Sequence, residues 1–88
     1  MREIVLDTET TGLSPQNGDR VVEIGCVELI NHIATGKTYQ TYLNPQKLME
    51  PSAEEVHGLS NDFLKDQPLF EEIFRDFLDF ISDSPLII

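Results

Sequence analysis

The first half of the chain contains three runs rich in β-branched and apolar residues, joined by short links. The runs are EIVLDTE (3–9), RVVEIGCVELI (20–30) and KTYQTYLNP (37–45), and runs of this kind are typical of β-strands. The link at 11–19 is dense in Gly, Ser, Pro, Asn and Asp, and the link at 31–36 ends in Gly, which favours loops. Because strands with short links usually pair in chain order, the sequence predicts a three-stranded antiparallel meander.

Helical patterns follow the meander. In PSAEEVHG, Ser52 and Glu55 match a capping box, and Gly58 suits the left-handed residue that ends a helix. Ser60 is expected to begin another short helical turn. From Pro68, a good first helical residue, apolar residues recur at helical spacing and predict a face that packs on the sheet: Phe70, Ile73, Phe74, Phe77 and Ile81.

The last four residues, PLII (85–88), have the composition of a buried strand at its start. No turn or polar cap follows Ile88, and a strand cut short leaves the preceding helix without a full partner. We therefore expect residues 1–88 to be the N-terminal part of one larger, incomplete domain.

The charge balance limits the partners of the chain. Sixteen acidic residues against six basic ones give a net charge of −10. Proteins that bind nucleic acid passively neutralise phosphates with Lys and Arg, so this charge disfavours such a protein. Divalent cations held by carboxylates reverse the sign of the local field. A metal-dependent enzyme that acts on phosphates is therefore less disfavoured.

Location and redox state follow from two further features. No apolar stretch approaches the ~20 residues that cross a bilayer, and the N-terminus MREIVLDTE lacks the hydrophobic region of a signal peptide. We expect a cytoplasmic protein with no membrane partner. The single cysteine, Cys26, cannot form an internal disulfide, and its apolar surroundings predict a place in the core.

Two acids, Asp7 and Glu9, stand one residue apart at the end of the first strand-like run. Side chains alternate along a strand, so both carboxylates point to the same side. Two close anions repel each other unless a cation lies between them, and Mg²⁺ and Mn²⁺ prefer carboxylate oxygens. Spacing alone favours the alternative of two solvated acids at a strand end. The small residues and Gly12 that follow favour a site, because they let a substrate backbone approach closely.

Four segments in order, IVLDTETTGL, RVVEIGCVEL, YLNP and VHGLSNDFL, resemble the DnaQ-like 3′-to-5′ exonucleases, also called the DEDD group. Within that family the chain is most similar to the epsilon-type proofreading branch of bacterial DNA polymerase III. The resemblance implies a ribonuclease-H-like α/β fold, with a mixed sheet opened by the meander, packed helices and a truncation after the start of the fourth strand. It implies a DNA exonuclease that proofreads during replication. An exoribonuclease of the same group and a non-catalytic polymerase-binding fragment remain alternatives.

The resemblance also implies a metal centre. Asp7 and Glu9 correspond to the first two of four acids that hold two divalent ions, Mg or Mn, and they count as catalytic and substrate-binding residues. The family's later motifs supply the other two acids and a general base, and these motifs are missing from the sequence. We expect the 88-residue chain alone to be inactive.

Four more residues are substrate contacts by resemblance. Thr10 and Gly12 would lie beside the terminal nucleotide, and Ser52 and His57 would face it from the first helix. For His57, the favourable charge of a helix C-terminus is an alternative explanation. The implied partners are the 3′ end of single-stranded DNA and the alpha subunit of DNA polymerase III.

Overall fold

The computed structural model describes every residue of the chain except 15 and 17, so part of the predicted loop 11–19 lies outside the described residues. Its elements follow the chain in this order: β1 (Arg2–Thr10), β2 (Val21–Ile30), β3 (Ile33–Tyr42), α1 (Pro51–His57), α2 (Asn61–Leu64), α3 (Phe70–Ile81) and β4 (Leu86–Ile87). The strand order is β3-β2-β1-β4, with β4 parallel to β1 and the other pairs antiparallel. The mixed α/β sheet that opens with a meander is confirmed.

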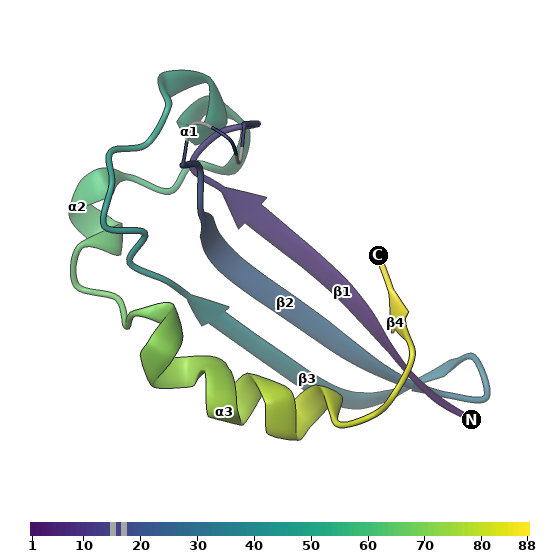
Figure 1. Cartoon of the computed structure of the whole chain (residues 1–88). Helices are drawn as coiled ribbons and strands as arrows, with labels where there is room; N and C mark the ends of the chain where they lie inside the picture. The colour runs from purple at the N-terminus through teal and green to yellow at the C-terminus, as the bar shows by residue number, and fades with distance from the viewer. Residues whose placement is uncertain (15, 17) are drawn as a thin grey trace.

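The layers are visible in Figure 1. Helix α3 runs along one face of the sheet, while α1 and α2 gather near the end of the sheet where β1 stops. One core cluster lies between the sheet and α3: Ile4, Ile24, Cys26, Leu43 and Ile73. A second cluster joins Val22 of β2 to Met49 and to Leu64 of α2.

The third strand begins earlier than the sequence predicted. Asn31 and His32 both have positive φ, 50° and 69°, and they join the paired residues Ile30 and Ile33. A two-residue hairpin turn needs this backbone at both positions. Gly36, with φ of 92°, lies inside β3 near a shift in its register with β2, so it belongs to a bulge. The prediction of 31–36 as a connection and of a strand at 37–45 is therefore wrong at both boundaries.

The first helix differs from the prediction at its start and agrees at its end. Glu50 is its N-cap and Pro51 its first residue, so Ser52 lies inside the first turn and the predicted capping box of Ser52 and Glu55 is wrong. Gly58 has φ of 73° and donates its N–H to the Glu54 carbonyl at 2.7 Å, as a left-handed C-cap should. Ser60 caps α2 as predicted, because its Oγ accepts a hydrogen bond from the Phe63 amide at 3.1 Å.

Helix α3 begins at Phe70, two residues after the predicted start at Pro68. Ile73 is buried and Phe77 packs against the same core, but Phe70 and Phe74 are 51% and 39% exposed. The residues that meet the sheet are spaced i, i+4, i+7 and i+8 from Ile73, which leaves Phe74 on the flank of this stripe, while Phe70 faces the sheet across an open cavity. The predicted core face is therefore right for Ile73, Phe77 and Ile81, and wrong in placing Phe70 and Phe74 in the packed core.

Cys26 is in the core as predicted, with 1% of its surface exposed. Burial raises the pKa of its thiol, because the thiolate loses its hydration. Among the described residues, no helix is long and apolar enough to cross a membrane.

Arg2 joins the start of β1 to the end of α3. Its Nε donates to Glu28 Oε2 at 2.6 Å, and its other guanidinium nitrogens donate to the Phe80 carbonyl at 2.5 Å and to Ser84 Oγ at 2.8 Å. The Arg2 guanidinium holds the pKa of the Glu28 carboxyl below its usual value. These contacts fix the exit of α3, from which the chain enters β4.

Candidate active site

The two predicted acids share one face of β1. Ile4 and Leu6 pack toward α3, so the alternation of side chains puts Asp7 and Glu9 on the opposite face. Both line a small cavity of about 90 Å³ together with Glu23 and Gly25 of β2. Asp7 is exposed and Glu9 is half-buried. The structure therefore brings the two acids together at one open concavity.

A β-bulge ends the regular pairing of β1 directly after Glu9. Glu9 is opposite Glu23, but Thr10 is opposite Val21, so Val22 is the extra residue on β2. Val22 is fully buried beneath α1 and α2. Bulges bend a strand and redirect its side chains, and they are frequent beside active sites. Here the bulge places Glu23 at the acidic cavity and its neighbour Val22 in the second core cluster.

Glu23 is a third carboxylate at the cavity, and the sequence reasoning missed it. It lies directly across from Glu9, and its Oε2 accepts a hydrogen bond from Gln40 Nε2 at 2.8 Å. Like charges that face each other across two strands destabilise a sheet. The signal that could have found Glu23 is the pairing register of β1 and β2, which the spacing within one strand does not give.

The donors at the cavity suit a hard divalent cation. Carboxylate oxygens are the ligands such ions prefer, and Mg²⁺ keeps several waters when proteins bind it. One oxygen of Asp7 also accepts a hydrogen bond from the Thr8 amide at 3.0 Å, which orients the carboxylate. In the part of the chain that the structure describes, no group of three or more His, Cys, Asp or Glu side chains is arranged to hold an ion. Two carboxylates supply only part of the oxygen shell that such an ion takes, so Asp7 and Glu9 suit it as two of its ligands.

Thr10 begins the turn that follows the acids, and His57 holds it. Thr10 Oγ1 donates to the Gly12 carbonyl at 2.6 Å. His57 Nε2 lies 3.1 Å from the Thr10 carbonyl oxygen, and the Leu59 amide lies 3.1 Å from Nδ1. A backbone amide only donates, so His57 Nδ1 accepts the hydrogen bond from Leu59. Nε2 therefore carries the ring proton and donates a hydrogen bond to the Thr10 carbonyl oxygen. His57 thus links the end of β1 to the end of α1.

Ser52 is exposed in the first turn of α1. Within the described residues no hydrogen bond connects it to Asp7 or Glu9. The structure thus brings Thr10, Gly12 and His57 into one connected segment beside the acids and leaves Ser52 outside it.

The turn after β1 is closed by Asp19, another residue that the sequence reasoning missed. Its carboxylate accepts hydrogen bonds from Thr11 Oγ1 at 2.8 Å, the Ser14 amide at 3.0 Å and Lys47 Nζ at 2.9 Å. Only 7% of the Asp19 side chain is exposed. The Lys47 hydrogen bond, followed by those from Ser14 and Thr11, lowers the pKa of Asp19 from 3.8 to about 2.

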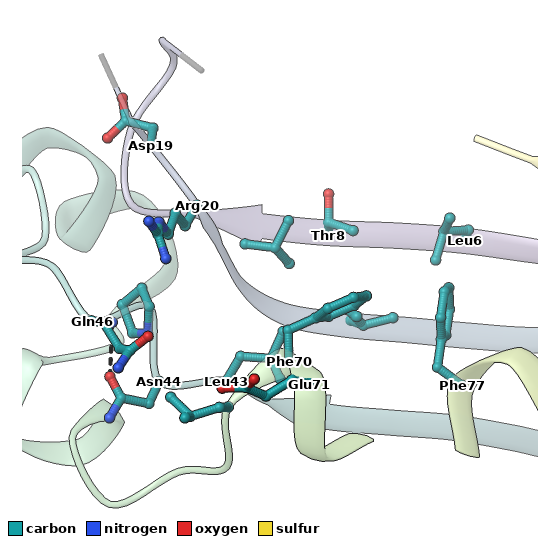
Figure 2. A pocket seen from close by; sticks show the side chains of 14 residues that line it. Leu6, Thr8, Asp19, Arg20, Leu43, Asn44, Gln46, Phe70, Glu71 and Phe77 are labelled. Carbon is teal, nitrogen blue, oxygen red and sulfur yellow. Dashed lines mark hydrogen bonds between the residues drawn. The ribbon is translucent and has the colours of Figure 1, made fainter. Parts of the chain in front are cut away.

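A larger cavity lies elsewhere. It measures about 650 Å³ and lies between the sheet and α3. Figure 2 shows Phe70 and Phe77 reaching from α3 toward β1 and β2, with Leu6 and Thr8 on the opposite wall. Asp19 and Arg20 lie at one end of it. Its walls are mostly apolar and belong to the face away from Asp7 and Glu9, so the smaller acidic cavity is the candidate active site.

The chain as a whole matches a known family. A family model described as exonuclease, of the RNase T type, matches residues 4–88. The chain therefore belongs to this exonuclease family.

The similar proteins are more specific. The chain is 57% identical over 88 residues to DNA polymerase III subunit epsilon of Rickettsia prowazekii, covering all of this chain and 38% of that protein. It is 43% identical over 91 residues to DNA polymerase III subunit epsilon of Escherichia coli, covering 99% of this chain and 37% of that protein. The chain thus spans about two fifths of the length of these curated relatives.

Solved structures share the fold. Exonuclease X in complex with 5′ overhanging duplex DNA superposes with a TM-score of 0.74 at 24% identity, covering 85% of this chain and 42% of that chain. E. coli exonuclease I in complex with an oligonucleotide gives a TM-score of 0.80 at 16% identity, covering 97% and 19%. At this identity the likeness shows the fold, and it agrees with the predicted ribonuclease-H-like α/β architecture.

Proposed function

We propose that residues 1–88 are the first part of a 3′-to-5′ DNA exonuclease domain of the epsilon type, which proofreads during DNA replication. One observation carries the proposal: Asp7 and Glu9 meet at an open cavity beside a β-bulge. Membership of the exonuclease family and 57% identity to an epsilon subunit support it.

Asp7 and Glu9 would hold the divalent ions, Mg or Mn. When bound, two such ions lower the pKa of a water and stabilise a leaving 3′ oxygen. The remaining acids and the general base come from residues outside these 88. The chain alone is therefore inactive.

The residues around the acids bind and orient the DNA end. The turn Thr10–Gly12 follows β1 and is held by His57, so its backbone meets the terminal nucleotide in a fixed position. His57 approaches that nucleotide from α1, where it contacts Thr10, while Ser52 on the same helix is a substrate contact by resemblance alone. The net charge of −10 repels phosphate, so DNA binds productively only where cations offset the carboxylates.

The proposal of an epsilon-type exonuclease also implies a partner and a cellular location for the longer protein. The longer protein docks onto the alpha subunit of DNA polymerase III, the polymerase whose errors it removes, and works in the cytoplasm. The relatives named DNA polymerase III subunit epsilon support this assignment.

The test is a full-length exonuclease in which residues 1–88 replace the matching segment of the Rickettsia prowazekii protein, referred to below as the graft. We expect it to release mononucleotides stepwise from a 3′-mismatched DNA primer with Mg²⁺ or Mn²⁺. Asp7→Asn and Glu9→Gln keep the side-chain size but lose a charge, so each should lower turnover by about 100-fold or more.

Asp66→Asn is the matched control, since Asp66 is exposed and far from the acids in the sequence. Near-parent turnover in Asp7→Asn and Glu9→Gln would rule out the metal role. An RNA primer of the same sequence, degraded faster than the DNA, would favour the exoribonuclease alternative.

A further inference from the structure

The turn after β1 is organised around Thr11, which is fully buried. Its amide donates to the Arg20 carbonyl at 2.8 Å, and its hydroxyl oxygen accepts from the Arg20 amide at 3.0 Å. Its carbonyl accepts from the Glu50 amide at 2.9 Å, just before α1. Thr11 thus ties the end of β1 to the start of β2 and to α1.

The Asp19 carboxylate completes this arrangement from one side. One oxygen, Oδ1, accepts from Thr11 Oγ1 and from Lys47 Nζ, and the other, Oδ2, accepts from the Ser14 amide. Hydrogen bonds to an ionised acceptor are about twice as strong as neutral ones. The Asp19–Lys47 pair therefore fastens the turn to the segment that leads into α1. Figure 2 shows Asp19 beyond the end of β1.

The position of the Asp19 carboxylate leaves no room for a side chain at residue 12. A Cβ added at Gly12 would lie 2.5 Å from Asp19 Oδ2 and 2.8 Å from Asp19 Cγ. Gly12 is buried, so the space in front of its Cα is filled by Asp19. The absence of a side chain at Gly12 thus lets Asp19 reach Thr11 and Ser14.

We propose that Asp19 is a positioning residue for the DNA end: through Thr11, Gly12 and Lys47 it holds the Thr10–Gly12 turn where the 3′-terminal nucleotide binds. This inference rests on the proposed function. Asp19 touches neither Asp7 nor Glu9 by any hydrogen bond among the described residues. Its effect therefore falls on the affinity for the DNA end and spares the hydrolytic step.

The first test is Asp19→Asn in the graft. Asn keeps the shape, but one of its two terminal atoms is now a donor, so it loses either the Ser14 contact or those to Thr11 and Lys47. We expect KM for a single-stranded oligonucleotide to rise about 10-fold, with kcat within about twofold of the parent, because the displaced turn loses binding that the ground state and the transition state share. Lys47→Met should shift KM in the same direction, and Asp66→Asn should change neither constant.

A lower melting temperature in Asp19→Asn with KM unchanged would reduce Asp19 to a structural residue and overturn the inference. So would a fall in kcat at constant KM. The parent graft separates the two proposals: if it shows no metal-dependent exonuclease activity, the proposed function fails, whereas an active parent with an unaffected Asp19→Asn variant removes only the role of Asp19.

The second test asks what Gly12 makes room for. Gly12→Ala collides with Asp19, so it should raise KM strongly, and the double variant Gly12→Ala with Asp19→Ala should raise it less than the sum of the single effects. If instead DNA fills the space at Gly12, the Gly12→Ala effect should persist undiminished without the Asp19 carboxylate. That additive result would contradict the inference.

Discussion

At the scale of single residues, the chain uses its acids in two opposite ways. Asp7, Glu9 and Glu23 share a cavity without a cationic side chain among its lining residues. Asp19 and Glu28 are each bonded to a base and to a hydroxyl. Paired carboxylates stabilise a fold, while grouped ones cost stability and suit a cation. The proposed function therefore rests on the first group.

The Asp19 network predicts a pH dependence of stability. The folded pKa of Asp19 is about 2, below its ordinary 3.8, so the unfolded chain binds more protons between these values. Its stabilising contribution is complete above about pH 4 and is lost as the pH falls toward 2. We expect urea denaturation between pH 5 and about pH 2 to show a shallower loss of stability in Asp19→Asn than in the parent.

Asp66→Asn serves as the control for this titration, because Asp66 is exposed. It should follow the parent curve. A parallel decline of Asp19→Asn and the parent across this range would show that the Asp19 carboxylate does not stabilise the folded chain.

At the scale of elements, the sequence predicts what depends on local pattern. Alternation along β1 places Asp7 and Glu9 on one face, and Gly58 and Ser60 mark helix boundaries correctly. The boundaries that the sequence predicts wrongly, such as the start of β3, depend on how strands pair with one another. Gly36 has the chemistry of a turn, but the turn at Asn31 and His32 places it within β3.

The same reason explains the site residues that sequence reasoning missed. Glu23 reaches the acids only through the register of β1 with β2. Asp19 and Lys47 are 28 residues apart and meet through a folded loop. Spacing within one element carries no information on such contacts.

His57 supplies a prediction about how α1 is attached to β1. His57→Asn has a side chain too short to bond both the Thr10 carbonyl and the Leu59 amide, which His57 contacts at 3.1 Å each. We expect the free energy of unfolding to fall by about 1 kcal/mol, since half-buried polar groups lose partners. Amide hydrogen exchange at Leu59 should become faster.

The matched control is His32→Asn, because His32 is exposed in a left-handed turn that Asn also adopts. Its stability should stay within about 0.5 kcal/mol of the parent. Unchanged protection of the Leu59 amide in His57→Asn would show that the ring does not hold α1 to β1.

At the scale of the whole molecule, charge and architecture combine. The net charge is −10, and the residues that line the acidic cavity lie on the face of β1 opposite the one that packs on α3. Figure 1 shows α1 and α2 near the end of the sheet where β1 stops. Self-repulsion of this size is relieved by any salt. A cation bound at Asp7 and Glu9 adds a further stabilisation, because it binds the folded chain and not the unfolded one.

Comparing MgCl2 or MnCl2 with NaCl at the same ionic strength separates these two effects. All three salts should raise the melting temperature of the chain by screening, and the divalent salts should raise it further. The extra gain is about 1.4 kcal/mol when the ion is present at about ten times its dissociation constant. Asp7→Asn and Glu9→Gln should each keep the screening response and lose most of the extra gain. Without divalent ions, the stability of each variant should equal or exceed that of the parent, because one repelling charge is gone.

Chelation with EDTA should return the melting temperature of the parent to its value in NaCl. An equal divalent response in the parent and both variants would place the cations on the general acidic surface and remove the metal site from Asp7 and Glu9.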